Sequence, residues 1–156
     1  MATGTMTEDP AIRVILVDDP PLEARALFAR AFDGHSIPDS PRHYVAFCPD
    51  TNGEDQFAGY CHATWCGEYA LMGGLCVNPD FRHKGVGHAL ERVLMEDTGP
   101  NKAFFSHTGN PTVVRMNARL GMEHSGYPNL MVKWTQDLSG PEKARILKEV
   151  HEIGPF

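Results

Sequence analysis

The chain has 156 residues, enough for one domain with a proper core, and its formal net charge is −6. This charge argues against a nucleic-acid partner, which usually requires a basic patch. No stretch approaches the ~20 apolar residues of a membrane span, and the N-terminus lacks a basic-then-apolar signal pattern. We therefore expect a single domain over residues 1–156, with a flexible tail at residues 1–9, outside any membrane.

Apolar runs, turn residues and helical spacing predict alternating strands and helices along the chain. In chain order the predicted elements are strand 12–17, helix 22–32, strands 43–48, 56–66 and 69–77, helix 86–98, strand 103–107, helix 110–121, strands 122–125 and 130–135, and helix 142–153. This order favours a mixed sheet covered by helices on both faces.

The four cysteines, Cys48, Cys61, Cys66 and Cys76, lie in strand-like apolar stretches. Such positions are typical of buried free thiols in a reducing compartment, so we predict a cytoplasmic protein. A zinc site has little support, because no C-x-x-C pair occurs and strand alternation separates Cys61 from His62 and Cys66. We predict no metal site.

The most informative stretch is 73–91, and within it Arg82-His83-Lys84-Gly85-Val86-Gly87. Its two glycines lie where a strand leads into a helix N-terminus. The first helix amides have no intrahelical partner there, and the helix dipole favours an anion. Arg82, His83 and Lys84 add positive charge, so the stretch predicts a phosphate or pyrophosphate site.

The spacing of this motif excludes two common phosphate-binding loops. The chain contains no G-x-x-x-x-G-K-[ST] string, and the Gly85 region lacks the third glycine of a dinucleotide fingerprint. Residues 82–87 instead resemble the R/Q-x-x-G-x-G/A motif of the GCN5-related N-acetyltransferases, the GNAT superfamily. The lead-in at residues 75–79 also resembles that family's "l-x-V-x-P" pattern.

A second stretch, NPTVVRMNARLGM at residues 110–122, resembles the family's downstream motif. The two motifs cover roughly residues 69–122. The resemblance implies an α/β (α+β) fold with a mixed, mostly antiparallel central sheet of about seven strands and helices on both faces. Strands 69–77 and 103–107 would splay apart to admit the pantetheine arm. Helix 142–153, within a C-terminal extension at residues 140–156, lies outside the resemblance.

The resemblance also implies which residues bind acetyl-CoA, the expected co-substrate. Backbone groups on the strand before the motif would hold the thioester carbonyl and the pantetheine, and the motif would hold the pyrophosphate. The implied cofactor-binding residues are Leu75, Cys76, Val77, Arg82, His83, Lys84, Gly85, Val86, Gly87, His88 and Asn110. Cys76 fits a small core residue better than a nucleophile.

The chain departs from the family at the positions that carry catalysis. Many members have a tyrosine four residues before the final glycine, as general acid to the thiolate; here that position is Asn117. Either water protonates the leaving group, or a nearby group such as Tyr127 or His107 does, or the activity is weak. Strand 69–77 also lacks the acidic base of several members, and Glu68 lies in the turn before it.

The sequence leaves the general base open. His107 ends strand 103–107 beside the expected splay, and a histidine titrates near neutral pH. His62 and His35 are the other candidates by chemistry, although His62 also fits sheet packing and His35 a solvated loop. We therefore take His107, Asn117 and Tyr127 as the candidate catalytic residues.

These features predict an N-acetyltransferase that moves an acetyl group from acetyl-CoA to a primary amine by direct attack on the thioester. Asp33 and Asp39 favour a small cationic amine as acceptor. A non-catalytic or regulatory acyl-CoA-binding domain and a protein or peptide N-acetyltransferase are the alternatives. The final helix could pack on the sheet, cover the acceptor site or form a contact in a homodimer.

Overall fold

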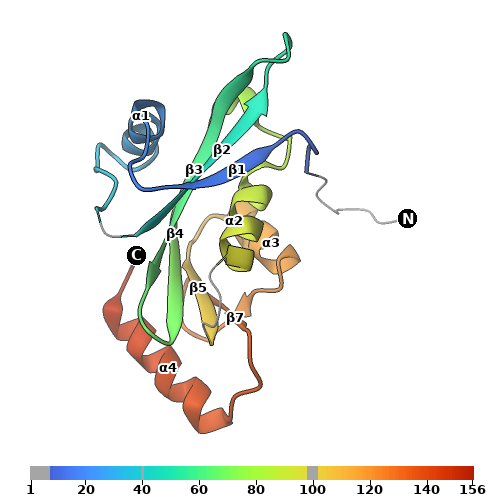
Figure 1. Cartoon of the computed structure of the whole chain (residues 1–156). Helices are drawn as coiled ribbons and strands as arrows, with labels where there is room; N and C mark the ends of the chain where they lie inside the picture. The colour runs from blue at the N-terminus through green and yellow to red at the C-terminus, as the bar shows by residue number, and fades with distance from the viewer. Residues whose placement is uncertain (1–7, 40, 98–101) are drawn as a thin grey trace. The chain divides into compact units, whose positions relative to one another are not determined.

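The computed structural model describes residues 8–39, 41–97 and 102–156. Seven strands form one sheet in the order β1-β2-β3-β4-β5-β7-β6 (Figure 1). Most neighbouring pairs are antiparallel, and β4 and β5 pair in parallel. The predicted fold class, a mixed and mostly antiparallel sheet with helices, is therefore confirmed. None of the described helices is long and apolar enough to cross a membrane.

The chain divides into two compact units. Unit 1 comprises Met1–Thr64 and Gly74–Asp97, and unit 2 comprises Trp65–Gly73 and Thr98–Phe156. Strand β4, Tyr69–Val77, contributes its first half to unit 2 and its second half to unit 1. The two units are described in turn.

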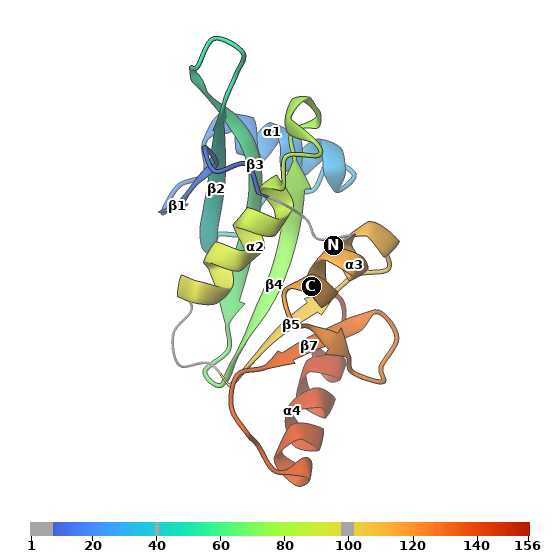
Figure 2. The same ribbon diagram turned by 90° about the vertical axis from the view of Figure 1, so that its right-hand side faces the viewer.

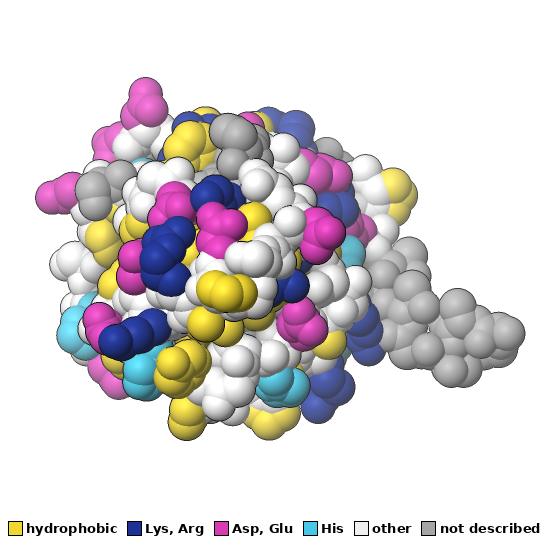
Figure 3. All heavy atoms as spheres, turned by 90° about the horizontal axis from the view of Figure 1, so that it is seen from below, with side chains coloured by type: hydrophobic (Ala, Val, Ile, Leu, Met, Phe, Trp, Pro, Cys, Tyr) yellow, Lys and Arg dark blue, Asp and Glu magenta, His cyan; other side chains and the backbone are white. Residues whose placement is uncertain are grey.

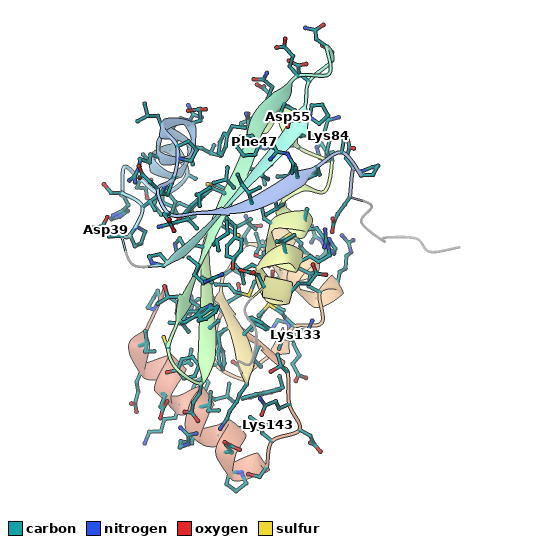
Figure 4. The ribbon with its side chains drawn as sticks, viewed as in Figure 1. Asp39, Phe47, Asp55, Lys84, Lys133 and Lys143 are labelled. Carbon is teal, nitrogen blue, oxygen red and sulfur yellow. The ribbon has the colours of Figure 1, made fainter. Side chains whose placement is uncertain are left out.

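Unit 1 places a helix on each side of its strands. Figure 2 shows α2 in front of these strands and α1 behind them. Its elements are β1 (Arg13–Val17), α1 (Leu22–Ala31), β2 (Arg42–Pro49), β3 (Asp55–Trp65), η1 (Pro79–Phe81) and α2 (Val86–Asp97). Arg13 of β1 donates to Asp55 of β3 at 2.8 Å and lies over the Phe47 ring of β2 (Figure 4).

The two faces of β3 carry different side chains, as its alternation predicts. On the α2 face, a Cβ added to Gly59 would lie 2.9 Å from the Cys76 carbonyl oxygen and 3.0 Å from Val86 Cγ1. Because glycine has no Cβ, the first turn of α2 packs directly against the strands. On the α1 face, Tyr60 packs with Phe28 in a buried cluster.

Unit 2 is built from β5 (Ala103–His107), α3 (Pro111–Arg119), β6 (Glu123–His124), β7 (Leu130–Trp134), α4 (Gly140–Ile153) and the start of β4. Ile146 and Val150 of α4 pack against Phe105 of β5 and Val132 of β7. Of the three roles considered for the final helix, packing on the sheet is therefore the one observed.

Ion pairs add to this packing of α4. Glu68 accepts hydrogen bonds from Arg145 at 2.9 Å and from Lys102 at 3.0 Å, and Lys102 also donates to Glu142 at 2.7 Å. The Arg145 hydrogen bond, followed by that of Lys102, lowers the pKa of Glu68 to about 2. Figure 3 shows acidic and basic side chains interleaved on the face that is seen from below.

The structure refines several sequence predictions. Strand β4 and strand β5 have the predicted bounds. Helix α3 begins after Asn110 and α4 begins at Gly140 rather than at 142, because the side chains of Asn110 and Ser139 cap them. The segment between β4 and α2 contains the short helix η1. The predicted stop of α2 at residues 98–100 lies outside the described residues, as do residues 1–7 of the predicted tail. Glu8 and Asp9, the last two residues of that tail, contact His88 and the Lys84 carbonyl, respectively.

We predict that Gly59→Ala destabilises the protein by about 1–3 kcal/mol, because the new methyl group overpacks the contact between α2 and the Cys76 carbonyl. Urea unfolding followed by circular dichroism measures the change. Gly140→Ala is the matched control, since a Cβ there meets nothing within 4 Å. Equal stability of Gly59→Ala and wild type would contradict the close approach.

Candidate functional site

A side-chain anchor fixes the connection between β4 and α2. Asn78 donates from Nδ2 to the Phe57 carbonyl at 2.8 Å, and its amide donates to the Ala58 carbonyl at 2.7 Å. Its Oδ1 accepts from the Asp80 amide at 3.1 Å and so caps η1. Phe81, at the end of η1, is buried. The chain therefore leaves β4 in a defined direction before it reaches the cationic loop.

The loop before α2 adopts an unusual backbone. His83 has φ +67° and Gly85 has φ +82°, both in the left-handed region. The first helical hydrogen bond runs from the Ala89 amide to the Gly85 carbonyl at 2.9 Å. The amides that precede Ala89 in the first turn have no intrahelical acceptor. A loop of this kind at a helix N-terminus is typical of an anion-binding concavity.

Positive charge surrounds this loop. Arg82, His83 and Lys84 are exposed, and Lys84 lies near the start of α2 (Figure 4). Lys84 Nζ is 3.9 Å from an Asp9 carboxylate oxygen, and the Asp9 amide donates to the Lys84 carbonyl at 2.8 Å. The side chains and the helix end together suit a phosphate or a pyrophosphate.

His88 already has an anionic partner in the protein itself. Its Nδ1 lies 2.5 Å from Oε2 of Glu8, and Arg92 donates to both Glu8 oxygens at 2.8 Å. The Arg92 hydrogen bond is the main cause that lowers the pKa of Glu8. The end of the predicted flexible tail is thus held against α2.

The second half of β4 carries the other predicted cofactor residues. The first half of β4 pairs in parallel with β5 from Tyr69↔Ala103 to Met72↔Ser106, and the splay beyond this point stays a prediction. Leu75 and Val77 are half-buried, whereas Cys76 is buried. Burial raises the pKa of the Cys76 thiol to about 12, so it stays protonated and packs as a core residue.

Asn110 and Asn117 have structural partners in unit 2. Asn110 is exposed, and its side chain accepts from the Thr112 amide at 2.9 Å as the cap of α3. Asn117 is 0% exposed and donates from Nδ2 to Ser106 Oγ at 3.0 Å. Its Oδ1 is buried without a hydrogen-bond partner among the described residues. Both side chains contribute to the packing of α3.

His107 and Tyr127 are also in unit 2, each beside an aromatic ring of the C-terminal region. His107 ends β5 and makes an edge contact with Phe156, with ring centroids 5.8 Å apart. Tyr127 stacks on His151, with ring centroids 4.1 Å apart. No hydrogen bond joins His107, Asn117 and Tyr127 within the described parts of the chain. Their catalytic roles stay predictions.

Unit 1 contains a buried polar group that motif comparison did not reveal. His43 of β2 is the cross-strand partner of His62 of β3. His43 Nδ1 lies 2.6 Å from the Tyr60 hydroxyl, and the Tyr60 and His62 ring centroids are 5.9 Å apart. His62 lies against the backbone of Gly74 on β4. Strand alternation places Tyr60 and His62 on one face, but only the fold brings His43 and Gly74 to them.

Unit 1 also has a buried acid and a cavity. Glu91 of α2 is 4% exposed, and burial raises the pKa of its carboxyl to about 8. A cavity of about 750 Å³ adjoins Lys84 and the first part of β3. Its wall includes Glu23 and Arg30 of α1 and Asp80 of η1. His62, nearer the end of β3, is not part of that wall.

The structure therefore groups the predicted residues unequally. Unit 1 contains the cationic loop at residues 82–87, His88 and the half of β4 that carries Leu75, Cys76 and Val77. Asn110, His107, Asn117 and Tyr127 belong to unit 2. The sequence did not indicate the contact of Glu8 with His88 and Arg92, because nothing local links residues 80 positions apart.

Comparison with known proteins identifies the family of this chain. The model of the acetyltransferase (GNAT) family matches residues 10–122. The mycothiol acetyltransferase of Mycobacterium sp. (strain JLS) is 34% identical over 87 residues, which are 54% of this chain. The chain spans only 28% of that relative's length.

Solved structures share the fold. The ribosomal-protein-S18-alanine N-acetyltransferase from Escherichia coli has a TM-score of 0.61 and 15% identity, over 83% of this chain and 97% of that one. A GNAT family N-acetyltransferase (YhbS) from Escherichia coli, solved in complex with CoA, has a TM-score of 0.55 and 20% identity, over 84% and 86%. At these identities the likeness concerns the fold.

We predict that Glu8→Gln lowers the free energy of unfolding by about 1 kcal/mol at neutral pH, because it weakens a charge-assisted pair. The folded pKa of Glu8 lies below 4.5, so this stability is present above pH 4.5 and is lost as the pH falls through the folded pKa. Urea unfolding at about pH 7 and about pH 3 measures it.

Glu96→Gln is the matched control for that experiment. Glu96 accepts from the same Arg92, but its side chain is 64% exposed, so we expect a loss below about 0.5 kcal/mol. Equal losses in the two variants, or a Glu8→Gln loss that grows towards acid pH, would refute the assignment.

Proposed function

The chain belongs to the acetyltransferase (GNAT) family, and on that premise we propose that it transfers the acetyl group of acetyl-CoA to a primary amine of a small molecule. The observation that carries the proposal is the loop before α2. It combines left-handed backbone at His83 and Gly85 with a cationic rim and a helix N-terminus. That combination suits the pyrophosphate of coenzyme A.

The proposed cofactor site lies within unit 1. The backbone amides of Leu75–Val77 would bind the pantetheine and the thioester carbonyl, as backbone donors do in an oxyanion hole. The pyrophosphate would contact Arg82, His83, Lys84, Gly85, Val86 and Gly87. His88 would contribute less than the sequence predicts, because its Nδ1 already contacts Glu8. Asn110 stays a prediction for the cofactor arm.

The proposed reaction is a direct transfer. The neutral amine attacks the thioester carbonyl carbon, the new carbon–nitrogen bond forms, and the carbon–sulfur bond breaks. A covalent route through Cys76 has little support, because its thiol is buried with a raised pKa. The chain's backbone amides orient the carbonyl, and a proton must pass from the amine nitrogen to the sulfur.

The acceptor class rests on sequence similarity. The mycothiol acetyltransferase shares 34% identity over its aligned part, whereas the ribosomal-protein-S18-alanine enzyme shares 15%. We therefore favour a small-molecule amine over a protein N-terminus. The free, largely buried cysteines fit a reducing compartment, so the cytoplasm is the proposed location.

One observation supports the alternative of a non-catalytic acyl-CoA-binding domain. The position of the family's tyrosine acid holds Asn117, which is 0% exposed and bonded to Ser106. Such a domain would bind coenzyme A but would turn over no amine. The two experiments below separate binding from turnover.

Acetyl-CoA and CoA are predicted to raise the melting temperature of the wild-type protein, and NAD is not. Arg82→Glu should weaken CoA affinity by about tenfold or more, because it reverses a charge beside the pyrophosphate. Arg119→Glu, on the exposed end of α3, is the matched control and should bind as wild type. No shift with either coenzyme would overturn the proposal.

A thiol-release assay then tests turnover. Benzylamine, spermidine and an alanine-initiated hexapeptide are supplied with acetyl-CoA, and we expect the small amines to be acetylated faster than the peptide. Turnover of the peptide alone would replace the small-molecule acceptor by a polypeptide. Coenzyme binding with no turnover of any amine would support the binding domain.

A further inference from the structure

We propose that His62 is the proton carrier of the acetyl transfer, taking the proton of the attacking amine and giving it to the departing sulfur. The inference rests on the function proposed above. It addresses the two groups that the sequence fails to supply, an acid on β4 and the tyrosine that Asn117 replaces.

The first observation is the contact of His62 with Gly74. A Cβ added to Gly74 would lie 2.7 Å from His62 Nε2 and 2.6 Å from its Cδ2. The imidazole from β3 therefore occupies the space that a side chain at position 74 of β4 would need. Gly74 also has φ +65°, which favours glycine at this position. Leu75, proposed to bind the thioester, is the next residue.

The second observation is the state of the two ring nitrogens. Nδ1 of His62 is buried without a hydrogen-bond partner among the described residues. The side chain as a whole is 9% exposed. Nε2, on the ring edge next to Gly74, is therefore the nitrogen that a ligand at β4 would meet. A buried polar atom without a partner is costly, so the packing around Nδ1 does not by itself account for a histidine at this position.

The surroundings keep His62 uncharged. The Phe28 ring of α1 lies 6.3 Å from its ring by centroids, and Tyr60 and His43 are its polar neighbours. Burial, and then the charge of His43, lowers the pKa of His62 to about 4. Burial also lowers the pKa of His43, on which Arg25, Asp19 and Asp39 act from α1 and the adjoining loops. His62 is thus a neutral imidazole at pH 7.

The low pKa makes the His62 imidazole a weak proton acceptor, but it makes the imidazolium a strong proton donor. As the amine attacks, its nitrogen becomes positively charged and releases a proton readily, which Nε2 accepts. The resulting imidazolium is a stronger acid than an ordinary thiol, whose pKa is about 8.5. It therefore gives the same proton to the sulfur as the carbon–sulfur bond breaks. The products are the amide and the coenzyme thiol, and His62 returns to its neutral form.

The nearest alternative groups are less suitable. Glu68, in the turn before β4, is bound by Arg145 and Lys102, which stabilise its ionised form. The Tyr60 hydroxyl is paired with His43. Burial raises its pKa, so it is a poor acid. His62 has no hydrogen-bond partner at Nδ1 among the described residues, and its ring lies against Gly74, the residue before Leu75.

The test compares His62→Gln with His124→Gln, which changes an exposed histidine of β6. Thiol release is measured with acetyl-CoA and benzylamine, or with the alanine-initiated hexapeptide if the peptide is the better acceptor. His62→Gln should lower kcat by about 100-fold and leave the KM for acetyl-CoA within about twofold. His124→Gln should leave both unchanged. The CoA-induced rise in melting temperature should persist in His62→Gln.

Chemical rescue separates a proton carrier from a packing residue. His62→Gly leaves a space of imidazole size, so added imidazole should raise the kcat of this variant at least about tenfold. N-methylated and more acidic imidazoles should restore activity according to their basicity. A packing role predicts no such dependence.

The pH profile gives a further readout. Because His62 is neutral above about pH 5, wild-type kcat/KM should rise with the deprotonation of the acceptor amine and show no histidine limb between pH 6 and 8. Wild-type kcat in His62→Gln, or rescue independent of imidazole basicity, would overturn the inference alone. Wild-type protein inactive with every amine would overturn the proposed function and this inference with it.

Discussion

The close approach of α2 to the strands at Gly59 fixes the position of the proposed phosphate-binding loop, residues 82–87. A side chain at position 59 would collide with the Cys76 carbonyl and with Val86, the first residue of α2. The helix N-terminus is therefore fixed against β3 and the second half of β4. Asn78 fixes the connection from the other side through its bonds to Phe57 and Ala58. The unpaired amides of the first turn of α2 are therefore held in a fixed position.

A second glycine repeats this device on the opposite face of unit 1. At Gly74 the space of the missing side chain is taken by His62, just as at Gly59 it is taken by α2. One face thus positions the groups proposed to bind phosphate, and the other positions the imidazole of His62 beside the same strand. Because both glycines contact β4 or its neighbours there, the proposed phosphate site and the proposed proton carrier depend on one strand.

The sequence predicted the parts of this arrangement that depend on local pattern. The apolar run of β4 and the motif at Arg82–Gly87 both carry their signal within a few residues. The contact of Glu8 with α2, the burial of Asn117 and the place of His62 over Gly74 depend on tertiary packing. The alternation of side chains along β3 predicted which face carries His62. It could not show that Gly74 of β4 leaves room for the His62 ring.

The second half of β4 and the start of α2 form the proposed coenzyme A site. An amide correlation spectrum of nitrogen-15-labelled protein, titrated with coenzyme A, tests this site directly. We predict that the largest shifts occur at residues 75–77 and 82–87, with saturation, and that NAD causes none there. Saturable shifts confined to other residues, or the absence of shifts at these amides, would contradict it.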